Sequence, residues 1–359
     1  MADNNYSMNV GVTDFNHIIN QMNSENDIND NPLDAFEINS EYYDIEDISA
    51  DINKNCQYTT LHLNIQSLPK KIDKLKILLS QLREKNIIID FIMLCETFLT
   101  DDIADNYELD GYTFKYKNRK VKKGGVGIYI NDKIHYSPRD DLSVFIEGEF
   151  ETIFVEVEQN DRNIIVGEIY RVPNTNELLS VNRYQTILDK LHHINKDVII
   201  GTDQNFDYLK INESCHINNL LNAFFSESIL PTITKPTRIT HKSATLIDNI
   251  YIKTSDPYTI QSGIIMTNMS DHLPVFSCMG KTKNEKFKQP LILKHRPLND
   301  KSLQNIKYML QITDWTNLEN MELDQAYKYF IEKINEVLEV LEVCAPEKQT
   351  AIKFIKREK

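Results

Sequence analysis

Residues 87–96 of the chain read IIIDFIMLCE, an apolar run that is interrupted only by Asp90 and ends at Glu96. A strand that is covered on both faces has such a nearly continuous apolar sequence, whereas a strand with one solvent face alternates apolar and polar residues. The stretch therefore predicts a central strand with a further layer on each side. Glu96 is expected at the end of that strand, where the sheet meets solvent.

The segments around this strand extend the pattern. Residues 58–64 carry Leu61 and Leu63 on one face, which predicts a strand, and residues 68–85 carry leucines along one helical stripe. Further strands are predicted at 112–116, 126–130, 152–157, 164–170, 198–200, 246–252, 263–266 and 275–278, and further helices at 177–194 and 214–225. Many strands with few helices indicate two mixed sheets packed face to face with helices outside, which is a four-layered α/β sandwich.

Two flanking regions differ from this body, which spans residues 56–280. Residues 1–55 hold twelve Asp and Glu residues but one Lys and show no sustained periodicity, so we expect a mostly disordered acidic leader. Its segment at residues 41–45 (EYYDI) could instead dock onto the body, although a free tail is the favoured alternative. Residues 281–359 begin as a Lys-rich linker and continue with apolar residues at helical spacing, which predicts a C-terminal helical extension.

The formal net charge of −13 argues against an enzyme that binds nucleic acid, because such an enzyme needs positive surface to meet phosphates. The acidic leader carries −11 of this charge, however, and leaves the rest of the chain nearly neutral. A local basic patch on the body is therefore compatible with the composition.

The five cysteines are scattered and lack the short spacing of a zinc or redox motif, so we expect reduced thiols in an intracellular protein. No stretch reaches the roughly 20 apolar residues of a membrane span. The N-terminal residues also lack the basic-then-apolar order of a signal peptide. We expect a monomer that does not associate with a membrane.

Acids, amides and one histidine stand at or just past the ends of the predicted strands. Strand ends at one rim of a sheet sandwich can converge on a single cleft even when they lie far apart in the sequence. Phosphodiester hydrolysis needs this inventory: oxygen ligands for a hard cation, a carboxylate that orients or deprotonates water, and donors for charge that grows on the phosphoryl oxygens. The residues are Asn64, Glu96, Tyr170, Asp203, Asn205, Asp248, Asn249, Asp271 and His272.

Each of these residues also has a purely structural interpretation. Glu96 can be a solvated strand end, and the sequence GTDQN at residues 201–205 can form a turn. Asp248 is harder to explain, because it lies within the apolar sequence LIDNIY and a buried acid without a partner is costly. The ordered set supports a functional interpretation more strongly than any single member does.

Six short motifs carry these residues: LNIQSL (63–68), LCET (94–97), IYRVPN (169–174), GTDQNF (201–206), TLID (245–248) and SDHLP (270–274). In this order they resemble the motifs of the endonuclease/exonuclease/phosphatase superfamily, over about residues 56–280. The sequence KPTRIT (235–240) before TLID resembles specifically the apurinic-type endonuclease domain of non-LTR retrotransposons. The resemblance implies a DNase I-like fold.

The resemblance also implies roles for the matching residues at the metal and the water. Glu96, assisted by Asn64, is expected to hold Mg²⁺, with Mn²⁺ as an alternative. Asp203 is expected to align or deprotonate the nucleophilic water, and Asn205 to position water or phosphate. Gln66 stands where the apurinic branch often has an Asp, so one negative charge near the metal is missing.

The other matching residues are expected at the phosphate. The resemblance implies that Tyr170 hydrogen-bonds the scissile phosphate. It also implies that His272 donates to a phosphoryl oxygen, while Asp248 orients this imidazole and raises its basicity. Asp271 is expected to assist at the metal or the leaving group, and Thr245 to contact backbone phosphate.

Basic residues are candidates for contact with DNA. The run at residues 117–123 includes Lys120 and Lys122, which could grip a phosphate backbone, act as a nuclear import signal or form a solvated hairpin loop. Arg171 could reach DNA or be a surface arginine without a special role.

We therefore predict a Mg²⁺-dependent, DNA-nicking endonuclease of the retrotransposon type that acts in the nucleus. The Tyr/Phe-x-Asp-Asp motif of a reverse transcriptase is absent from the sequence, so such a partner would be encoded elsewhere. Two alternatives stay open. One is a phosphatase or phosphodiesterase of the same fold that acts on a small molecule or lipid, and the other is a catalytically silent binding module derived from a retroelement.

Overall fold

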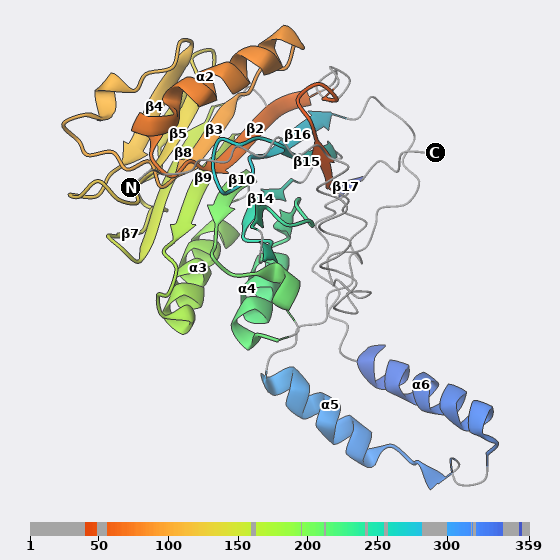
Figure 1. Ribbon diagram of the computed structural model, residues 1–359. Helices are drawn as coiled ribbons and strands as arrows, with labels where there is room; N and C mark the ends of the chain where they lie inside the picture. Colours follow the sequence, from red (N-terminus) through yellow and green to blue (C-terminus); the bar gives the residue numbers. More distant parts are fainter. Residues whose placement is uncertain are drawn as a thin grey trace, which may run out of the picture.

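The computed structural model of the protein consists of two mixed β-sheets packed face to face, with helices on the outer side of each sheet (Figure 1). This arrangement confirms the predicted four-layered α/β sandwich. The residues that the structure describes are 40–48, 56–158, 163–194, 196–211, 213–240, 243–254, 258–281, 300–316, 318, 321–339 and 352–353.

The first sheet contains β1 (Glu41–Tyr43), β2 (Cys56–Asn64), β3 (Phe91–Cys95), β4 (Tyr112–Lys117), β5 (Val126–Asn131), β15 (Tyr258–Ile265), β16 (Val275–Lys281) and β17 (Ile352–Lys353). Their order is β1-β15-β16-β2-β3-β5-β4, with β17 paired to β15. The apolar run predicted as a central strand forms β3, and its two faces are buried in different clusters. Met93 and Cys95 point into the interior between the sheets, whereas Ile92 and Leu94 point outward.

Helix α2 (Leu68–Glu84) covers the outer face of the first sheet. Its leucines recur at helical spacing, and the buried ones pack against Leu61 and Leu63 of β2 and Ile92 and Leu94 of β3. The apolar stripe of the helix therefore matches the outward residues of the two central strands. This packing holds α2, which follows β2 in the chain, against the outer face of β2 and β3.

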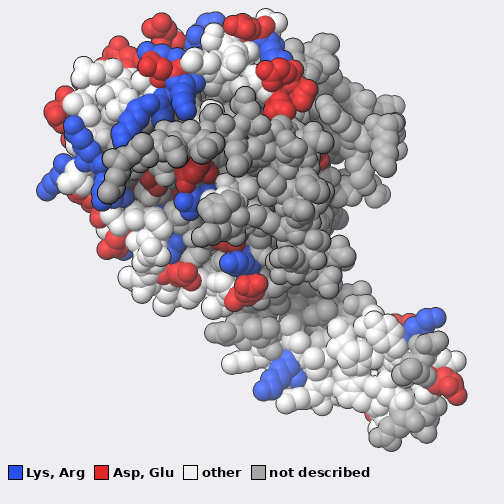
Figure 2. Space-filling model, viewed as in Figure 1, with Lys and Arg blue, Asp and Glu red and all other residues white. Residues whose placement is uncertain are grey.

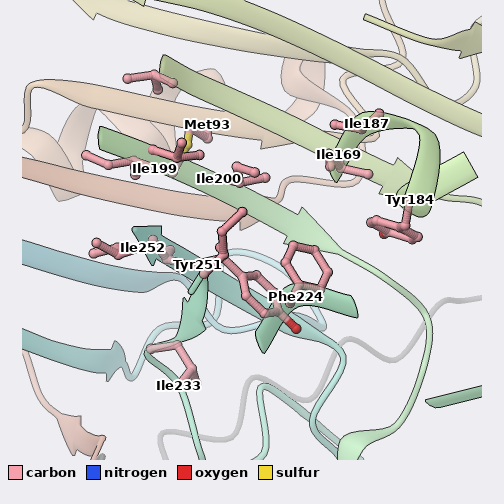
Figure 3. Packing of buried hydrophobic residues seen from close by; sticks show 14 of the residues in the cluster. Met93, Ile169, Tyr184, Ile187, Ile199, Ile200, Phe224, Ile233, Tyr251 and Ile252 are labelled. Carbon is pink, nitrogen blue, oxygen red and sulfur yellow. The ribbon is translucent and has the colours of Figure 1, made fainter. Parts of the chain in front are cut away.

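The second sheet contains β6 (Tyr136–Pro138), β7 (Phe145–Ile146), β8 (Phe150–Val157), β9 (Ile164–Arg171), β10 (Asp197–Asp203), β11 (Leu230–Pro231) and β14 (Asp248–Lys253). Their order is β11-β14-β10-β9-β8-β6, with β7 paired to β8. Helices α3 (Glu177–His192) and α4 (Cys215–Ser226) lie on its outer face. Phe224 of α4 stacks on Tyr251 of β14 with ring centroids 4.0 Å apart, as the close view of the packing shows (Figure 3).

The tyrosine patch in the leader is part of the body. Glu41, Tyr42 and Tyr43 form β1, which pairs in parallel with residues 263–265 of β15 at the edge of the first sheet. Tyr42 is buried, and its hydroxyl donates to the carbonyl of Pro236 at 2.9 Å. Of the two alternatives for this segment, the structure shows the docked one and not the free tail. The rest of the predicted leader, residues 1–39 and 49–55, lies outside the described residues.

The predicted C-terminal extension contains two helices, α5 (Asp300–Ile312) and α6 (Leu323–Glu339), which contact each other to one side of the sandwich.

A short hairpin of β12 (Arg238–Ile239) and β13 (Ala244–Thr245) lies between β11 and β14 in the chain. Among the helices of the described residues, none is long and apolar enough to cross a membrane.

Candidate active site

Three neighbouring strands of the second sheet carry site residues in one row. Asp203 of β10 is in register with Tyr170 of β9 on one side and with Asp248 of β14 on the other. Residues in register on adjacent strands point to the same face of a sheet. The row therefore brings residues that are far apart in the sequence to one rim of the sandwich, and all three are almost fully buried.

The first sheet supplies the opposite wall of the site. Asn64 ends β2 and is in register with Cys95, so Glu96 follows directly beside it. The Asn64 amide nitrogen Nδ2 donates to Glu96 Oε1 at 2.9 Å and to Asp203 Oδ2 at 2.8 Å. The Tyr170 hydroxyl donates to the same Glu96 oxygen at 2.8 Å. These bonds cross between the sheets and tie four of the predicted residues into one cluster.

The backbone at Glu96 is strained. Its φ angle is 52°, in the left-handed region that is unfavourable for residues other than glycine. The carbonyl of Glu96 accepts from the Ser67 amide at 2.8 Å, and Ser67 itself has a φ of 89° at the start of α2. The turn from β2 into α2 therefore holds Glu96 in a conformation that it would not adopt alone. Such strain is typical of functional positions.

His272 is held by the carboxylate of Asp248. Its Nδ1 lies 2.9 Å from Asp248 Oδ2 and 3.0 Å from Oδ1, while the Thr237 hydroxyl donates to Oδ2 at 2.6 Å. The same Nδ1 is 4.0 Å from Asp203 Oδ2, which places the imidazole against the row on the second sheet. Because Nδ1 is occupied, Nε2 is the atom available to a substrate.

The electrostatics of the cluster fit acid–base chemistry. Burial alone would lower the pKa of His272, but the charges of Asp248, Asp203 and Asp271 raise it to about 9. Burial and the charge of Asp248 raise the pKa of Asp203 to about 7, although His272 and the amide of Asn64 oppose this shift. At neutral pH His272 is therefore a charged donor, and Asp203 can both accept and release a proton.

Asp248 and Tyr170 keep single protonation states. Burial would raise the pKa of Asp248, yet the charges and hydrogen bonds of His272 and His62 hold it well below its usual range. Burial, followed by the charges of Glu96 and Asp203, raises the pKa of the Tyr170 phenol far above its usual value. Asp248 is thus a permanent acceptor in this site, and Tyr170 is a permanent donor.

The donor set of the site fits a divalent metal ion of the hard type. Oxygens of Glu96 and Asp203 converge on a single amide group, and carboxylate and amide oxygens are the ligands that Mg²⁺ and Mn²⁺ prefer. Ligand atoms of Asp203, Asp248 and His272 also lie within 4.8 Å of one another. Asn64 presents its nitrogen to the carboxylates here. To serve as a ligand it would turn its side-chain amide so that Oδ1 takes that place.

Three predicted residues lie at the rim with partners of their own. Asn205 donates through Nδ2 to the carbonyl of Arg171 at 2.7 Å, and its backbone amide donates to Asp203 Oδ1 at 3.1 Å. Asp271 accepts from Arg238 Nε at 2.9 Å and Nη2 at 2.8 Å. Thr245 lies in β13 and donates weakly to the carbonyl of Arg238 at 3.4 Å. Asp271 is therefore paired with a cation.

The structure contradicts the expectation that Arg171 reaches DNA. The residue is 2% exposed, and its Nη1 donates to the carbonyls of Gln204 at 3.3 Å and Asn205 at 3.1 Å. The guanidinium carbon also lies 4.0 Å from the centroid of the Phe206 ring. Arg171 is a structural residue that fixes the loop after β10. The sequence could not show this, because its partners are backbone carbonyls.

The basic run lies beside the site. Backbone amides of Thr97 and Phe98 donate to the carbonyls of Gly125 and Gly124 at the end of the run, directly after Glu96. Two of its cations are neutralised, because Lys117 pairs with Asp140 and Arg119 with Glu151. Within the described part of the chain, no ion pair engages the exposed side chains of Lys120, Lys122 and Lys123.

Three further groups at this site were not predicted from the sequence. His62 and Glu168 are fully buried behind Asn64 and Tyr170, with His62 Nδ1 at 3.0 Å from Glu168 Oε2. Lys71 of α2 is half-buried: burial lowers the pKa of its amino group, and the nearby charges of Asp271 and Glu96 oppose that shift. The available signal in the sequence was a titratable residue between nonpolar neighbours within a predicted strand, as His62 is in LHL and Glu168 is in GEI. Figure 2 shows Lys and Arg side chains gathered over the region of α2.

No protein-family model and no curated protein matches this sequence. Among solved structures, the endonuclease domain of TRAS1, a telomere-specific non-LTR retrotransposon, is similar at a TM-score of 0.47 and 11% identity, over 63% of this chain and 100% of that one. A humanized D. rerio TDP2 gives 0.48 and 13%, over 62% and 99% of the two chains. An endonuclease/exonuclease/phosphatase family protein from Leptotrichia buccalis C-1013-b gives 0.44 and 15%, over 62% and 99%. At such identity the likeness concerns the fold alone, so function has to be inferred from the residues of this chain.

Proposed function

We propose that the protein is a metal-dependent phosphodiesterase that nicks DNA. The observation that supports this most strongly is the double hydrogen bond of Asn64, which joins Glu96 from one sheet to Asp203 from the other beside the Asp248–His272 pair. This geometry combines oxygen ligands, a carboxylate base and a charged donor at one rim, which are the components that hydrolysis of a phosphodiester needs.

In the proposed reaction, Asp203 accepts a proton from a water molecule as that water attacks phosphorus. The bond from phosphorus to the leaving ester oxygen breaks, and this oxygen departs and takes up a proton from solvent. A base with a pKa near the operating pH is suited to this step, and the pKa of Asp203 is raised to about 7. His272 donates from Nε2 to a phosphoryl oxygen on which negative charge grows, and Asp248 holds the ring through Nδ1. Tyr170 adds a neutral donor toward the same phosphate.

Glu96 and Asn64 are the residues proposed to hold Mg²⁺. When bound, the ion would supply positive charge to the phosphoryl oxygens and orient the scissile bond. Glu96 is only partly buried, so the position leaves room for the waters that Mg²⁺ retains.

DNA is favoured over a small phosphorylated molecule by the basic loop. Lys120, Lys122 and Lys123 are exposed in the loop that pairs with the residues directly after Glu96, so a polyanion with many phosphates could contact them while one phosphate lies at the catalytic cluster. The retrotransposon type of endonuclease, indicated by the motif order, is the form of this proposal that we prefer. A small-molecule or lipid phosphodiesterase of the same fold is the second candidate.

A nicking assay on supercoiled plasmid with the full chain tests the proposal. We expect Mg²⁺-dependent conversion to the open circle that a chelator abolishes. Asp203→Asn and His272→Ala should each lower the rate by a factor of about 10² or more, because each removes a proton-transfer or charge-stabilising group. Glu84→Gln, an exposed change at the end of α2, should leave the rate near that of the wild type.

The same preparation distinguishes the alternatives. Turnover of inositol phosphates with intact plasmid would support the small-molecule candidate. Binding of DNA with no turnover of either substrate would support the silent binding module. Nicking that is equal in the wild type, Asp203→Asn and His272→Ala would reject the assigned site.

A further inference from the structure

A buried pair of ionisable residues lies directly behind the proposed catalytic groups. His62 of β2 and Glu168 of β9 have no exposed side-chain surface, and each stands two residues before a site residue on the same face of its strand. His62 Nδ1 is 3.0 Å from Glu168 Oε2, so the pair bridges the two sheets. The pair therefore lies behind Asn64 and Tyr170, two residues further into the interior of the sandwich.

A glycine makes room for this pair. A Cβ atom at Gly201 of β10 would lie 2.5 Å from Glu168 Oε2, which is closer than real Cβ contacts allow, and 3.0 Å from His62 Nδ1, which is tighter than most of them. Gly201 stands two residues before Asp203 and is in register with Glu168 on the neighbouring strand β9. The second sheet therefore leaves out one side chain at the point where the imidazole and the carboxylate meet.

The other nitrogen of His62 faces the catalytic cluster. Its Nε2 lies 3.6 Å from Asp248 Oδ1, on the side of the carboxylate away from Thr237, whose hydroxyl donates to Oδ2. Asp248 in turn holds His272. The four side chains form one continuous chain, Glu168–His62–Asp248–His272, that runs from the interior to the rim of the site.

We infer that His62, supported by Glu168, is a positioning residue that fixes the Asp248 carboxylate for its contact with His272. The inference rests on the proposed function, because it assigns to the pair a role in that same site. Both ring nitrogens of His62 face carboxylates: Nδ1 lies 3.0 Å from Glu168 Oε2, within hydrogen-bond distance, and Nε2 lies 3.6 Å from Asp248 Oδ1, just beyond it.

Stability alone gives little reason for such a pair. Replacement of a buried ion pair by apolar residues of similar volume is often neutral or stabilising, whereas removal of one partner is costly. Within the part of the chain that the structure describes, His62 Nε2 and Glu168 Oε1 make no hydrogen bond. The contact of 3.6 Å is thus available to shorten when substrate fixes His272, as catalytic hydrogen bonds often do.

The decisive variant replaces the whole pair. His62→Leu together with Glu168→Met removes both charges at nearly constant volume, so the folded protein should be as stable as the wild type or more so. We expect kcat for plasmid nicking to fall roughly tenfold to a hundredfold with KM unchanged, the usual effect of removing a residue that orients a catalytic group. Thr60→Val is the matched control, because Thr60 is buried on the same strand and face and donates to the Ser277 carbonyl rather than to a site residue.

A readout without substrate separates this inference from the proposed function. The imidazole proton between His272 Nδ1 and Asp248 gives a downfield proton resonance, assigned by its loss in His272→Ala. We expect this resonance to shift in the double variant and to stay in place in Thr60→Val. Glu168→Gln, which keeps the shape but removes the charge, should shift it in the same direction if the double variant does not fold.

Three results would overturn the inference. One is an unchanged kcat in the folded double variant, and another is a His272 resonance that does not move. The third is one equivalent of tightly bound zinc in the wild type that the double variant loses. Ligand atoms of His62, Glu168 and Cys95 lie within 4.8 Å of one another, so zinc would make the pair a metal site instead. A wild type that does not nick plasmid would reject the proposed function, while the resonance would still decide the role of His62.

Discussion

The buried carboxylate of Asp248 and the partly buried carboxylate of Asp90 show how partners decide the effect of burial on a pKa. Asp248 lies between His272 and His62, which hold its pKa well below the usual range even though burial acts in the opposite direction. The Asp90 carboxylate, just before β3, accepts from the backbone amide of Thr59 at 2.9 Å, and burial raises the pKa of Asp90 to about 6. Ionisation of Asp248 is therefore favourable in the folded protein. The Asp90 carboxylate also ionises at neutral pH, but its surroundings in the folded protein disfavour the charge.

Asp90→Asn should therefore stabilise the protein, and the gain should depend on pH. The folded-state pKa of Asp90 is raised above its value in the unfolded chain, so its contribution to stability is favourable at low pH and is lost as the pH rises through about 6. At pH 8 we expect the free energy of unfolding to rise by about 3 kcal/mol in the variant, since the pKa of Asp90 is raised from 3.8 to about 6 and one pKa unit corresponds to ~1.4 kcal/mol. Near pH 4 the two proteins should differ little. Thermal unfolding at both pH values measures this.

Asp110→Asn is the control for this prediction, because Asp110 is exposed in the turn before β4. A gain of the same size at pH 4 and pH 8 in Asp90→Asn would show that folding does not raise the pKa of the Asp90 carboxyl.

At the scale of elements, β1 adds a short edge strand to the first sheet from the region before β2. Ser40 Oγ lies 3.2 Å from Thr234 Oγ1, and Tyr42 reaches the carbonyl of Pro236, so this strand contacts the segment that leads into the β12–β13 hairpin. That hairpin carries Arg238, which pairs with Asp271 at the rim of the site. The docked strand thus supports the site indirectly.

Tyr42→Ala should lower the free energy of unfolding by about 2–4 kcal/mol, because it removes a buried aromatic side chain and its hydrogen bond. Glu41→Ala, which removes only an exposed ion pair with Lys235, should change it by less than about 1 kcal/mol. Chemical denaturation of the full chain measures both. Equal losses in the two variants would mean that β1 does not pack as described.

The sequence predicted the elements that periodicity or apolar runs define, such as β3, α2 and the three strands that carry Tyr170, Asp203 and Asp248. It also placed the site residues at strand ends, because an acid or amide that directly follows an apolar run marks the point where a buried strand reaches the rim of its sheet. Contacts between sheets could not be predicted in this way. The bond of His62 to Glu168 and the burial of Arg171 depend on which strands face each other, and this follows from topology rather than from local pattern.

At the scale of the whole molecule, the negative net charge and the basic loop act in opposite directions on DNA. A body that is nearly neutral overall can still bind a polyanion where Lys120, Lys122 and Lys123 are exposed beside the site. The binding should then depend strongly on salt, because phosphate contacts release counterions.

Lys120→Ala with Lys122→Ala should weaken DNA binding and reduce the slope of log K against log salt by about 2, or about 1 for each phosphate that a lysine no longer neutralises. Lys133→Ala is the control, because this exposed lysine follows the opposite end of β5 from the basic loop. Fluorescence anisotropy with a short duplex at several salt concentrations measures the slopes. Identical slopes in all three proteins would exclude the loop from the DNA interface.

We propose that the ends of separate strands form one site for a divalent cation, with Glu96 as its main ligand. Titration with Mn²⁺, with the free ion followed by electron paramagnetic resonance, tests this without any substrate. We predict one Mn²⁺ site per chain, for which Mg²⁺ competes. Glu96→Gln should weaken Mn²⁺ binding at least tenfold, whereas Glu84→Gln at the exposed end of α2 should not. Equal Mn²⁺ affinity in the wild type and Glu96→Gln, or no bound Mn²⁺ in the wild type, would contradict the account.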